Sequence, residues 1–135
     1  MARIRWDDSM RYGVAELDEL HEDLTAVIGD LADAHLRGAD PELLEDMAEE
    51  LYDLALHVFG VEEERMEEHG YARTAEHKAA HAAILRECAA PLMDYLDGEA
   101  ELTCALLDDL AARWTAHLAG EDRALAQALA GPPAV

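Results

Sequence analysis

Histidine is frequent in this chain, with seven copies among 135 residues, and the spacing of these histidines indicates a shared site. His77 and His81 are four residues apart, so in a helix both side chains project from the same face. Facing helices of a bundle can present such groups, together with carboxylates, to a metal ion. The pattern gives seven candidate metal ligands: His21, His57, Glu62, His77, His81, His117 and Asp122.

The other two histidines have a simpler interpretation. His35 and His69 each fall at the expected C-terminus of a helix, where the helix dipole favours an imidazolium. His21 alone could likewise be an ordinary core residue. Five histidines and two acids spread over four helices are different, because each buried polar group without a partner costs roughly 1–3 kcal/mol. A metal cluster satisfies all of them together.

The mixture of ligands limits the kind of metal. Five imidazoles and two carboxylates exceed what one tetrahedral zinc ion uses. They suit two five- or six-coordinate ions bridged by the carboxylates, and mixed nitrogen and oxygen ligation suits iron, manganese or cobalt. The Glu-x-x-His motif of ferritin-like di-iron proteins is absent, and Asp18-x-x-His21 is the nearest sequence to it.

Helices must position these side chains, because apolar residues recur with a helical period throughout and no strand alternation occurs. Short connections make successive helices antiparallel neighbours, which predicts an all-α fold, an up-down-up-down four-helix bundle. Residues 1–15, with Trp6 and Tyr12, are expected to form an ordered arm that packs on the bundle. The four helices are expected at about residues 16–36, 41–69, 74–97 and 99–130.

Local signals mark the ends of these helices. Asp40-Pro41-Glu42 reads as an N-cap followed by a first-turn proline and acid, and Thr74 reads as the next N-cap. Pro91 lies inside the third helix and is expected to kink or break it. Gly38, Gly70 and Gly98 are expected to stop the first three helices, and Gly131-Pro132-Pro133 the fourth.

Composition favours a single intracellular domain. A length of 135 residues fits one domain, and no apolar run is long enough to span a bilayer. Cys88 and Cys104 are too few for a disulfide scaffold, and the N-terminus lacks the apolar segment of a signal peptide, so we expect a cytoplasmic protein with reduced thiols. The net charge of −21 argues against nucleic acid or an anionic membrane as partner. The simplest reading of this acidity is a solubilising surface.

Four groups of residues carry a resemblance to a known family. They are Trp6-Asp7-Asp8-Ser9 with Gly13-Val14 and Leu17-Asp18-Glu19-Leu20-His21; Phe59, Glu62-Glu63, Met66 and Gly70-Tyr71; His77-Lys78-Ala79-Ala80-His81; and His117-Leu118-Ala119-Gly120-Glu121-Asp122-Arg123. Over nearly its whole length the chain resembles the hemerythrins, and most closely the single-domain bacteriohemerythrins.

The resemblance implies a role for each candidate ligand. His77, His81 and His117 would hold one iron, and His21 and His57 would hold a second iron that keeps an open position for dioxygen. The cofactor would be two non-haem iron ions bridged by Glu62, Asp122 and an oxo or hydroxo group.

The sequence departs from this family pattern in the second helix. The family places a histidine four residues before the bridging glutamate, whereas His57 precedes Glu62 by five and Val58 occupies the family position. In a regular helix five residues turn about 140° away from the same face. A π-bulge near Gly60 would bring His57 back, and we favour it because His117 and Asp122 are also five apart with a glycine between them. The alternative is a lost ligand, with Val58 facing the site.

Two smaller departures concern the pocket. The family often has a tyrosine where this chain has Leu125, and a phenylalanine where Val58 follows His57. With the bulge, Phe59 takes the place of that phenylalanine in an oxygen pocket.

The leading hypothesis is a dioxygen-binding protein for storage, delivery or sensing, with at most weak oxidase or peroxidase activity. A di-iron redox enzyme that consumes peroxide or nitric oxide is the alternative, and the absence of His57 from the site would favour it. A third hypothesis is a metal-sequestering or purely structural bundle. With the bulge in place, His57→Ala is expected to keep the fold and one iron and to lose stable oxygen binding.

Overall fold

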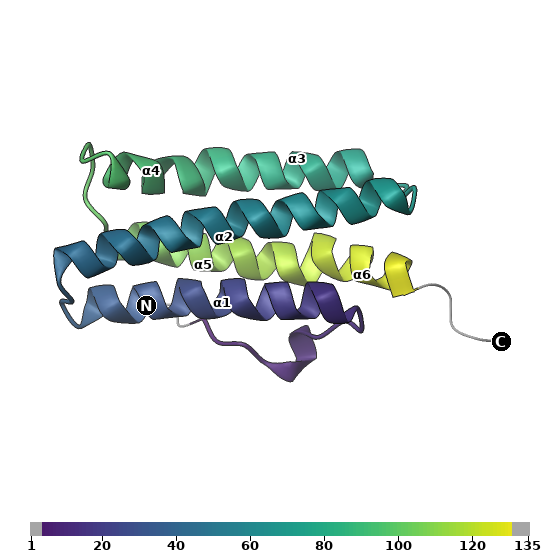
Figure 1. Ribbon diagram of the computed structural model, residues 1–135, viewed down its shortest axis with the longest axis horizontal. Helices are drawn as coiled ribbons and strands as arrows, with labels where there is room; N and C mark the ends of the chain where they lie inside the picture. The colour runs from purple at the N-terminus through teal and green to yellow at the C-terminus, as the bar shows by residue number, and fades with distance from the viewer. Residues whose placement is uncertain (1–3, 131–135) are drawn as a thin grey trace.

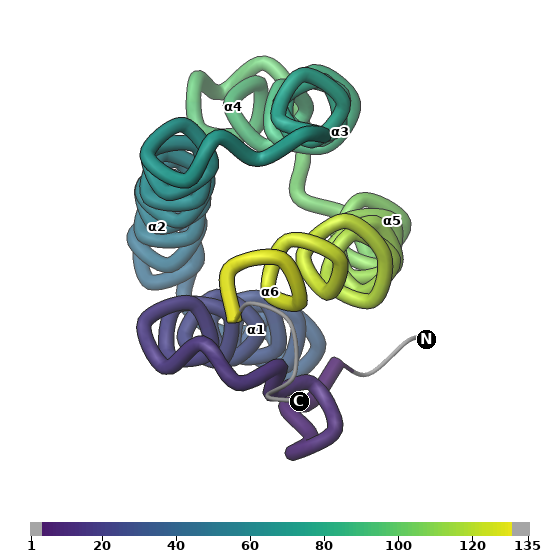
Figure 2. Tube along the Cα trace, turned by 90° about the vertical axis from the view of Figure 1, so that its right-hand side faces the viewer, coloured from purple at the N-terminus to yellow at the C-terminus, as the bar shows by residue number. Residues whose placement is uncertain are grey.

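The computed structural model describes residues 4–130, which form an antiparallel four-helix bundle (Figure 1). Within these residues there is no strand, and no helix is both long enough and apolar enough to cross a membrane. Seen end-on, the four rods form a ring in which α1 lies beside α2 and α5 (Figure 2). The rods are α1 (Ala15–Leu36), α2 (Pro41–Glu68), α3 (Thr74–Ile84) with η2 (Leu85–Ala89) and α4 (Ala90–Leu96), and α5 (Cys104–His117) with η3 (Leu118–Asp122) and α6 (Arg123–Ala130).

Glycines end the first two helices as the sequence predicts. Gly38 and Gly70 have φ values of 69° and 60°, in the left-handed region that glycine enters without a Cβ clash. After Gly38, the Ala39 N–H reaches back to the Ala34 carbonyl at 3.0 Å, which closes a Schellman motif. These tight ends keep the connections short and the helices antiparallel.

Two of the predicted helix starts need correction. Asp40 caps α2 as expected, since its side chain accepts a hydrogen bond from the Glu42 N–H at 2.9 Å. The fourth helix begins at Cys104 rather than Glu99, because the Thr103 hydroxyl caps it by accepting the Leu106 N–H at 3.1 Å. Thr74 is the first residue of α3 rather than its N-cap.

The expected interruption near Pro91 takes the form of the π-helix η2, which ends at Ala89. Its wider turn appears in the hydrogen bond from the Ala90 N–H to the Leu85 carbonyl, five residues back. Proline has no N–H to donate, and its ring crowds the carbonyl of the preceding turn. A wider turn just before Pro91 lets the helix continue into α4 without a break.

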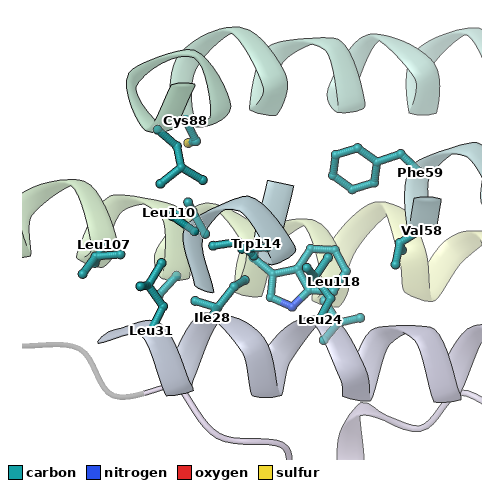
Figure 3. Close-up of a cluster of buried hydrophobic side chains, with 14 residues drawn as sticks. Leu24, Ile28, Leu31, Val58, Phe59, Cys88, Leu107, Leu110, Trp114 and Leu118 are labelled. Atoms are coloured by element: carbon teal, nitrogen blue, oxygen red, sulfur yellow. The ribbon is translucent and has the colours of Figure 1, made fainter. Parts of the chain in front are cut away.

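The interior consists of two apolar clusters with a polar layer between them. The larger cluster fills most of the bundle, and Figure 3 shows Val58, Phe59 and Trp114 within it. The smaller cluster contains Leu17, Met66 and Leu125. In three rods a buried acid or histidine separates the two clusters along the chain: Leu17–His21–Leu24, Phe59–Glu62–Met66 and Leu118–Asp122–Leu125.

The N-terminal arm packs on the larger cluster, through Trp6 and Tyr12 among others. Asp18, buried in the first turns of α1, accepts hydrogen bonds from the Tyr12 and Gly13 N–H groups at 2.8 and 3.2 Å. Asp18 therefore anchors the arm and does not act as a partner of His21. Residues 1–3 of the expected arm and the Gly131-Pro132-Pro133 stop signal lie outside the described residues.

Candidate metal centre

Six of the seven candidate ligands meet in the polar layer of the bundle. His21 comes from α1, Glu62 from α2, His77 and His81 from α3, His117 from the end of α5 and Asp122 from the end of η3. Each of these side chains is at most 4% exposed. One donor atom from each of five of them lies within 4.8 Å of all the others: Glu62, His77, His81, His117 and Asp122.

The two carboxylates divide the cluster into two sides. Glu62 Oε1 lies 2.9 Å from His81 Nε2 and 3.5 Å from His77 Nε2. Asp122 Oδ1 lies 3.1 Å from both His77 Nε2 and His117 Nε2. These two oxygens therefore face the three-histidine side of the cluster.

The second oxygen of each carboxylate faces His21. Glu62 Oε2 lies 2.6 Å from His21 Nε2, and Asp122 Oδ2 lies 3.4 Å from the same nitrogen. Each carboxylate thus spans two groups of nitrogen donors, one with three imidazoles and one with a single imidazole.

His57 does not join the cluster, and the predicted π-bulge in the second helix is wrong. α2 is a continuous α-helix from Pro41 to Glu68, and the His57 side chain is exposed. Val58, four residues before Glu62, is 0% exposed and faces inward with Phe59. This agrees with the alternative interpretation of the sequence, in which α2 has lost its histidine ligand. In a regular α-helix, the separation of five residues places the His57 side chain about 140° around the helix axis from that of Glu62. The His57 imidazole therefore lies at the surface.

The fourth rod (α5, η3 and α6) contains the same five-residue spacing between a histidine and an acid, but in a different backbone conformation. Five residues separate His117 from Asp122, and the π-helix η3 fills the interval. The wider turn places both side chains on the inner face, with His117 Nε2 and Asp122 Oδ1 3.1 Å apart. The bulge that the sequence indicated for two helices occurs in this one.

The buried carboxylates and imidazoles shift the pKa values of one another. Burial alone would raise the pKa of the Glu62 carboxyl, but the imidazoles of His21, His77 and His81 beside its oxygens hold that pKa well below its usual range. Burial lowers the pKa of His77, yet the carboxylates of Asp122 and Glu62, 3.1 and 3.5 Å from its Nε2, outweigh this and raise it to about 9. An ionised carboxylate such as Glu62 beside a protonated imidazole such as His77 is a site in which a cation can replace the proton.

The donor set fits metal ions. Among the residues that the structure describes, His77 Nε2, His117 Nε2 and both Asp122 carboxylate oxygens are buried without a hydrogen-bond partner, although all point into the cluster. Unpartnered buried polar atoms are rare because each is costly. Cations between the two carboxylates and the four imidazoles would satisfy these atoms and balance the negative charge.

Comparison with known proteins agrees with this geometry. The sequence profile of the family described as "Hemerythrin HHE cation binding domain" matches residues 12–129. This chain belongs to the hemerythrin family. Among solved structures, wild-type hemerythrin superposes with a TM-score of 0.82 at 24% identity, covering 91% of this chain and 95% of that one. A single-substitution mutant of hemerythrin gives 0.83 at the same identity, covering 94% and 100%.

Two bacterial relatives extend the comparison. The bacteriohemerythrin of Pseudomonas aeruginosa is 30% identical over 99 residues, which cover 73% of this chain. The match spans 64% of that relative's own length. The bacteriohemerythrin of Stenotrophomonas maltophilia is 28% identical over 131 residues, which cover 93% of this chain and 81% of the relative.

In this hemerythrin-family chain, several residues that the sequence did not single out support the ligand candidates. Glu63 accepts a hydrogen bond from His81 Nδ1 at 2.8 Å, which leaves Nε2 free to face the cluster. The Trp114 indole donates to the Thr25 hydroxyl, which donates to the His21 carbonyl, each at 2.8 Å. The sequence contained one signal for the supporting role of Glu63, its position directly after Glu62. It contained no such signal for Thr25.

An apolar cavity of about 40 Å³ adjoins the cluster. Phe59 and Trp114 line this cavity and also lie against the histidines. The Phe59 ring stacks on the His81 ring with 4.1 Å between the ring centroids, and the centroids of the Trp114 and His21 rings are 5.7 Å apart. The cavity exceeds the roughly 10–15 Å³ that one water molecule needs, but its apolar walls offer a water few hydrogen bonds. Such a space suits a small apolar molecule.

Proposed function

We propose that this chain is a non-haem di-iron protein that binds dioxygen reversibly, for storage, delivery or sensing. The observation that carries the proposal is the bridging placement of Glu62 and Asp122, each with one oxygen toward three histidines and the other toward His21. Carboxylates placed in this way suit two neighbouring ions better than one. Membership of the hemerythrin family makes iron the expected metal.

The chain's own residues divide the work of holding the metals. His77, His81 and His117 would hold one iron with Glu62 Oε1 and Asp122 Oδ1. His21 would hold the other with the second oxygen of each carboxylate. When bound, the two irons supply the electrons and the open coordination position that dioxygen binding requires.

The surrounding side chains prepare the site for that ligand. Glu63 fixes the ring of His81 through its hydrogen bond to Nδ1. Phe59 and Trp114 lie between the cluster and the apolar cavity, so the surroundings of the cluster on that side are apolar. A dry, apolar approach favours a small uncharged ligand such as dioxygen over ions and larger polar molecules.

The position of His57 supports a second candidate function. With His57 at the surface, the His21 side has one imidazole and two carboxylate oxygens, so the protein leaves more coordination positions of that iron for small ligands. A more open iron favours a di-iron redox enzyme that consumes peroxide or nitric oxide.

The visible spectrum of the anaerobic ferrous protein distinguishes the two candidates, with iron counted per chain. We expect two irons and a charge-transfer band that appears in air and disappears under argon. A one-way conversion to a ferric spectrum contradicts reversible binding and supports the redox enzyme. Failure to bind iron at all contradicts both.

A further inference from the structure

We propose that the two metal positions have unequal affinities, that the His21 position fills last and empties first, and that Val58 is the residue responsible. This inference rests on the proposed di-metal function and adds to it which position is weak and why. It follows from the donors that each side of the cluster presents.

The number of protein donors differs between the two sides. The three-histidine side has five: Nε2 of His77, His81 and His117, Glu62 Oε1 and Asp122 Oδ1. The His21 side has three: His21 Nε2, Glu62 Oε2 and Asp122 Oδ2. Because metal affinity rises with the number and charge of well-placed donors, the first side is the stronger one.

The hydrogen-bond partners of the outer ring nitrogens, Nδ1, also favour the three-histidine side. On the stronger side, His81 Nδ1 is bound by Glu63 at 2.8 Å and His117 Nδ1 has Glu121 at 3.7 Å, whereas His77 Nδ1 has no hydrogen-bond partner among residues 4–130. On the weaker side, the single histidine, His21, has no partner for Nδ1 within the same residues. Outer partners of this kind orient a ligand and raise its basicity, so their absence weakens the His21 position further.

Val58 occupies the place from which α2 could supply a fourth donor. It lies one regular turn before Glu62, on the same inner face, and it is completely buried. Its isopropyl group offers no donor atom, and the neighbouring imidazole of His57 points to solvent. α2 therefore gives the weak position one carboxylate oxygen and nothing else.

The test measures Fe²⁺ binding itself, anaerobically, by competition with a chelator and by counting ions that survive desalting. For the unaltered chain we expect two binding steps whose dissociation constants differ by about ten-fold or more. His21→Ala is expected to remove the weaker step and to keep the stronger one. Two steps of equal affinity in the unaltered chain would overturn the inference.

Val58→His provides the gain-of-ligand arm. We expect it to tighten the weaker step by about ten-fold and to leave the stronger step unchanged. Val61→His is the matched control, because Val61 lies on the same helix but lines a surface groove with His57 and Arg65. A folded Val58→His protein whose weaker step is unchanged, or a Val61→His protein whose weaker step tightens equally, contradicts the role of Val58.

These outcomes separate the inference from the proposed function. A chain that binds no Fe²⁺ overturns the di-iron function itself, whereas two equally tight ions leave that function intact and overturn only the asymmetry. If circular dichroism shows that Val58→His does not fold, the two steps of the unaltered chain and the loss of one step in His21→Ala decide the question.

Discussion

Residues 57–62 and 117–122 each place a histidine five residues before an acid with a glycine in between, yet they adopt different conformations. The first is a regular α-helix with its histidine at the surface. The second is a π-helix with its histidine in the buried cluster of candidate ligands. The same spacing therefore gives a buried candidate ligand in one rod and a surface residue in the other.

The residue two positions after each histidine explains the difference. In α2 it is Phe59, which is 3% exposed and stacks on His81. In the fourth rod it is Ala119, which is exposed. Turning α2 to bring His57 inward would expel Phe59, and leaving a phenylalanine exposed costs roughly 1.5–3 kcal/mol. An exposed histidine costs little, so α2 keeps its regular register.

The largest predicted effect comes from deleting one residue in each segment. Deletion of Gly60 places His57 four residues before Glu62 but turns the upstream half of α2, including buried Leu51, by about 100°. We expect a loss of about 4 kcal/mol or more in unfolding free energy. Deletion of Gly120 converts η3 to a regular turn with His117 and Asp122 still on one face, and we expect a change within about 1 kcal/mol.

Urea unfolding of the two deletion proteins, followed by circular dichroism, measures both changes. Equal losses of stability would show that α2 and the fourth rod do not differ in register, and would break the comparison.

Removing the aromatic ring tests the proposed cause directly. Phe59→Ala is expected to cost about 3–5 kcal/mol, because the buried ring leaves a cavity beside His81. Leu56→Ala is the control, since Leu56 lies on the same helix at 41% exposure and should cost under about 1 kcal/mol. Denaturant titrations of the metal-free proteins measure both. A Phe59→Ala cost no larger than that of Leu56→Ala would contradict the role of Phe59 in holding the register.

Glu62 and Asp122, the acids that end the two segments, both face His77. This arrangement predicts that the stability of the metal-free protein depends on pH. Burial lowers the pKa of His77, but Asp122 and Glu62 raise it to about 9 from its ordinary 6.5. The stabilisation from its proton is complete below pH 6.5 and is lost as the pH rises through about 9. We expect a loss of about 2–3 kcal/mol over this range.

Urea unfolding of the metal-stripped protein at several pH values measures this loss. His77→Gln should flatten the profile, and His69→Gln, at an exposed position, should not. A profile that His77→Gln leaves unchanged would assign the pH dependence to other groups.

The smallest predicted effect concerns the glycine in α2. Gly60 lies in a regular helix, and a Cβ added there meets no atom within 4 Å. Gly60→Ala should therefore stabilise the protein by about 0.5–1 kcal/mol, because alanine loses less backbone freedom on folding. Thermal melting measures the change. A destabilised Gly60→Ala protein would indicate that this position needs the conformational freedom of glycine after all.

The sequence predicted the bundle because helical periodicity, glycine stops and the Asp40 cap all act locally. It predicted that His77 and His81 share a face for the same reason. The predicted start of the fourth helix at residue 99 was wrong, because Thr103, rather than a residue of the preceding turn, caps the helix. The register of α2 was missed because it depends on the packing of Phe59 against His81, a contact between rods that spacing along one helix does not contain.

His57 lies at the surface, outside the candidate metal centre. The most direct measurement is iron per chain in His57→Ala beside the unaltered protein, both loaded anaerobically with Fe²⁺ and desalted under the same conditions. We expect the same iron content and the same spectrum in air from both proteins, because the exposed imidazole lies outside the cluster. Loss of iron or of the oxygenated spectrum in His57→Ala would contradict it and place His57 among the ligands.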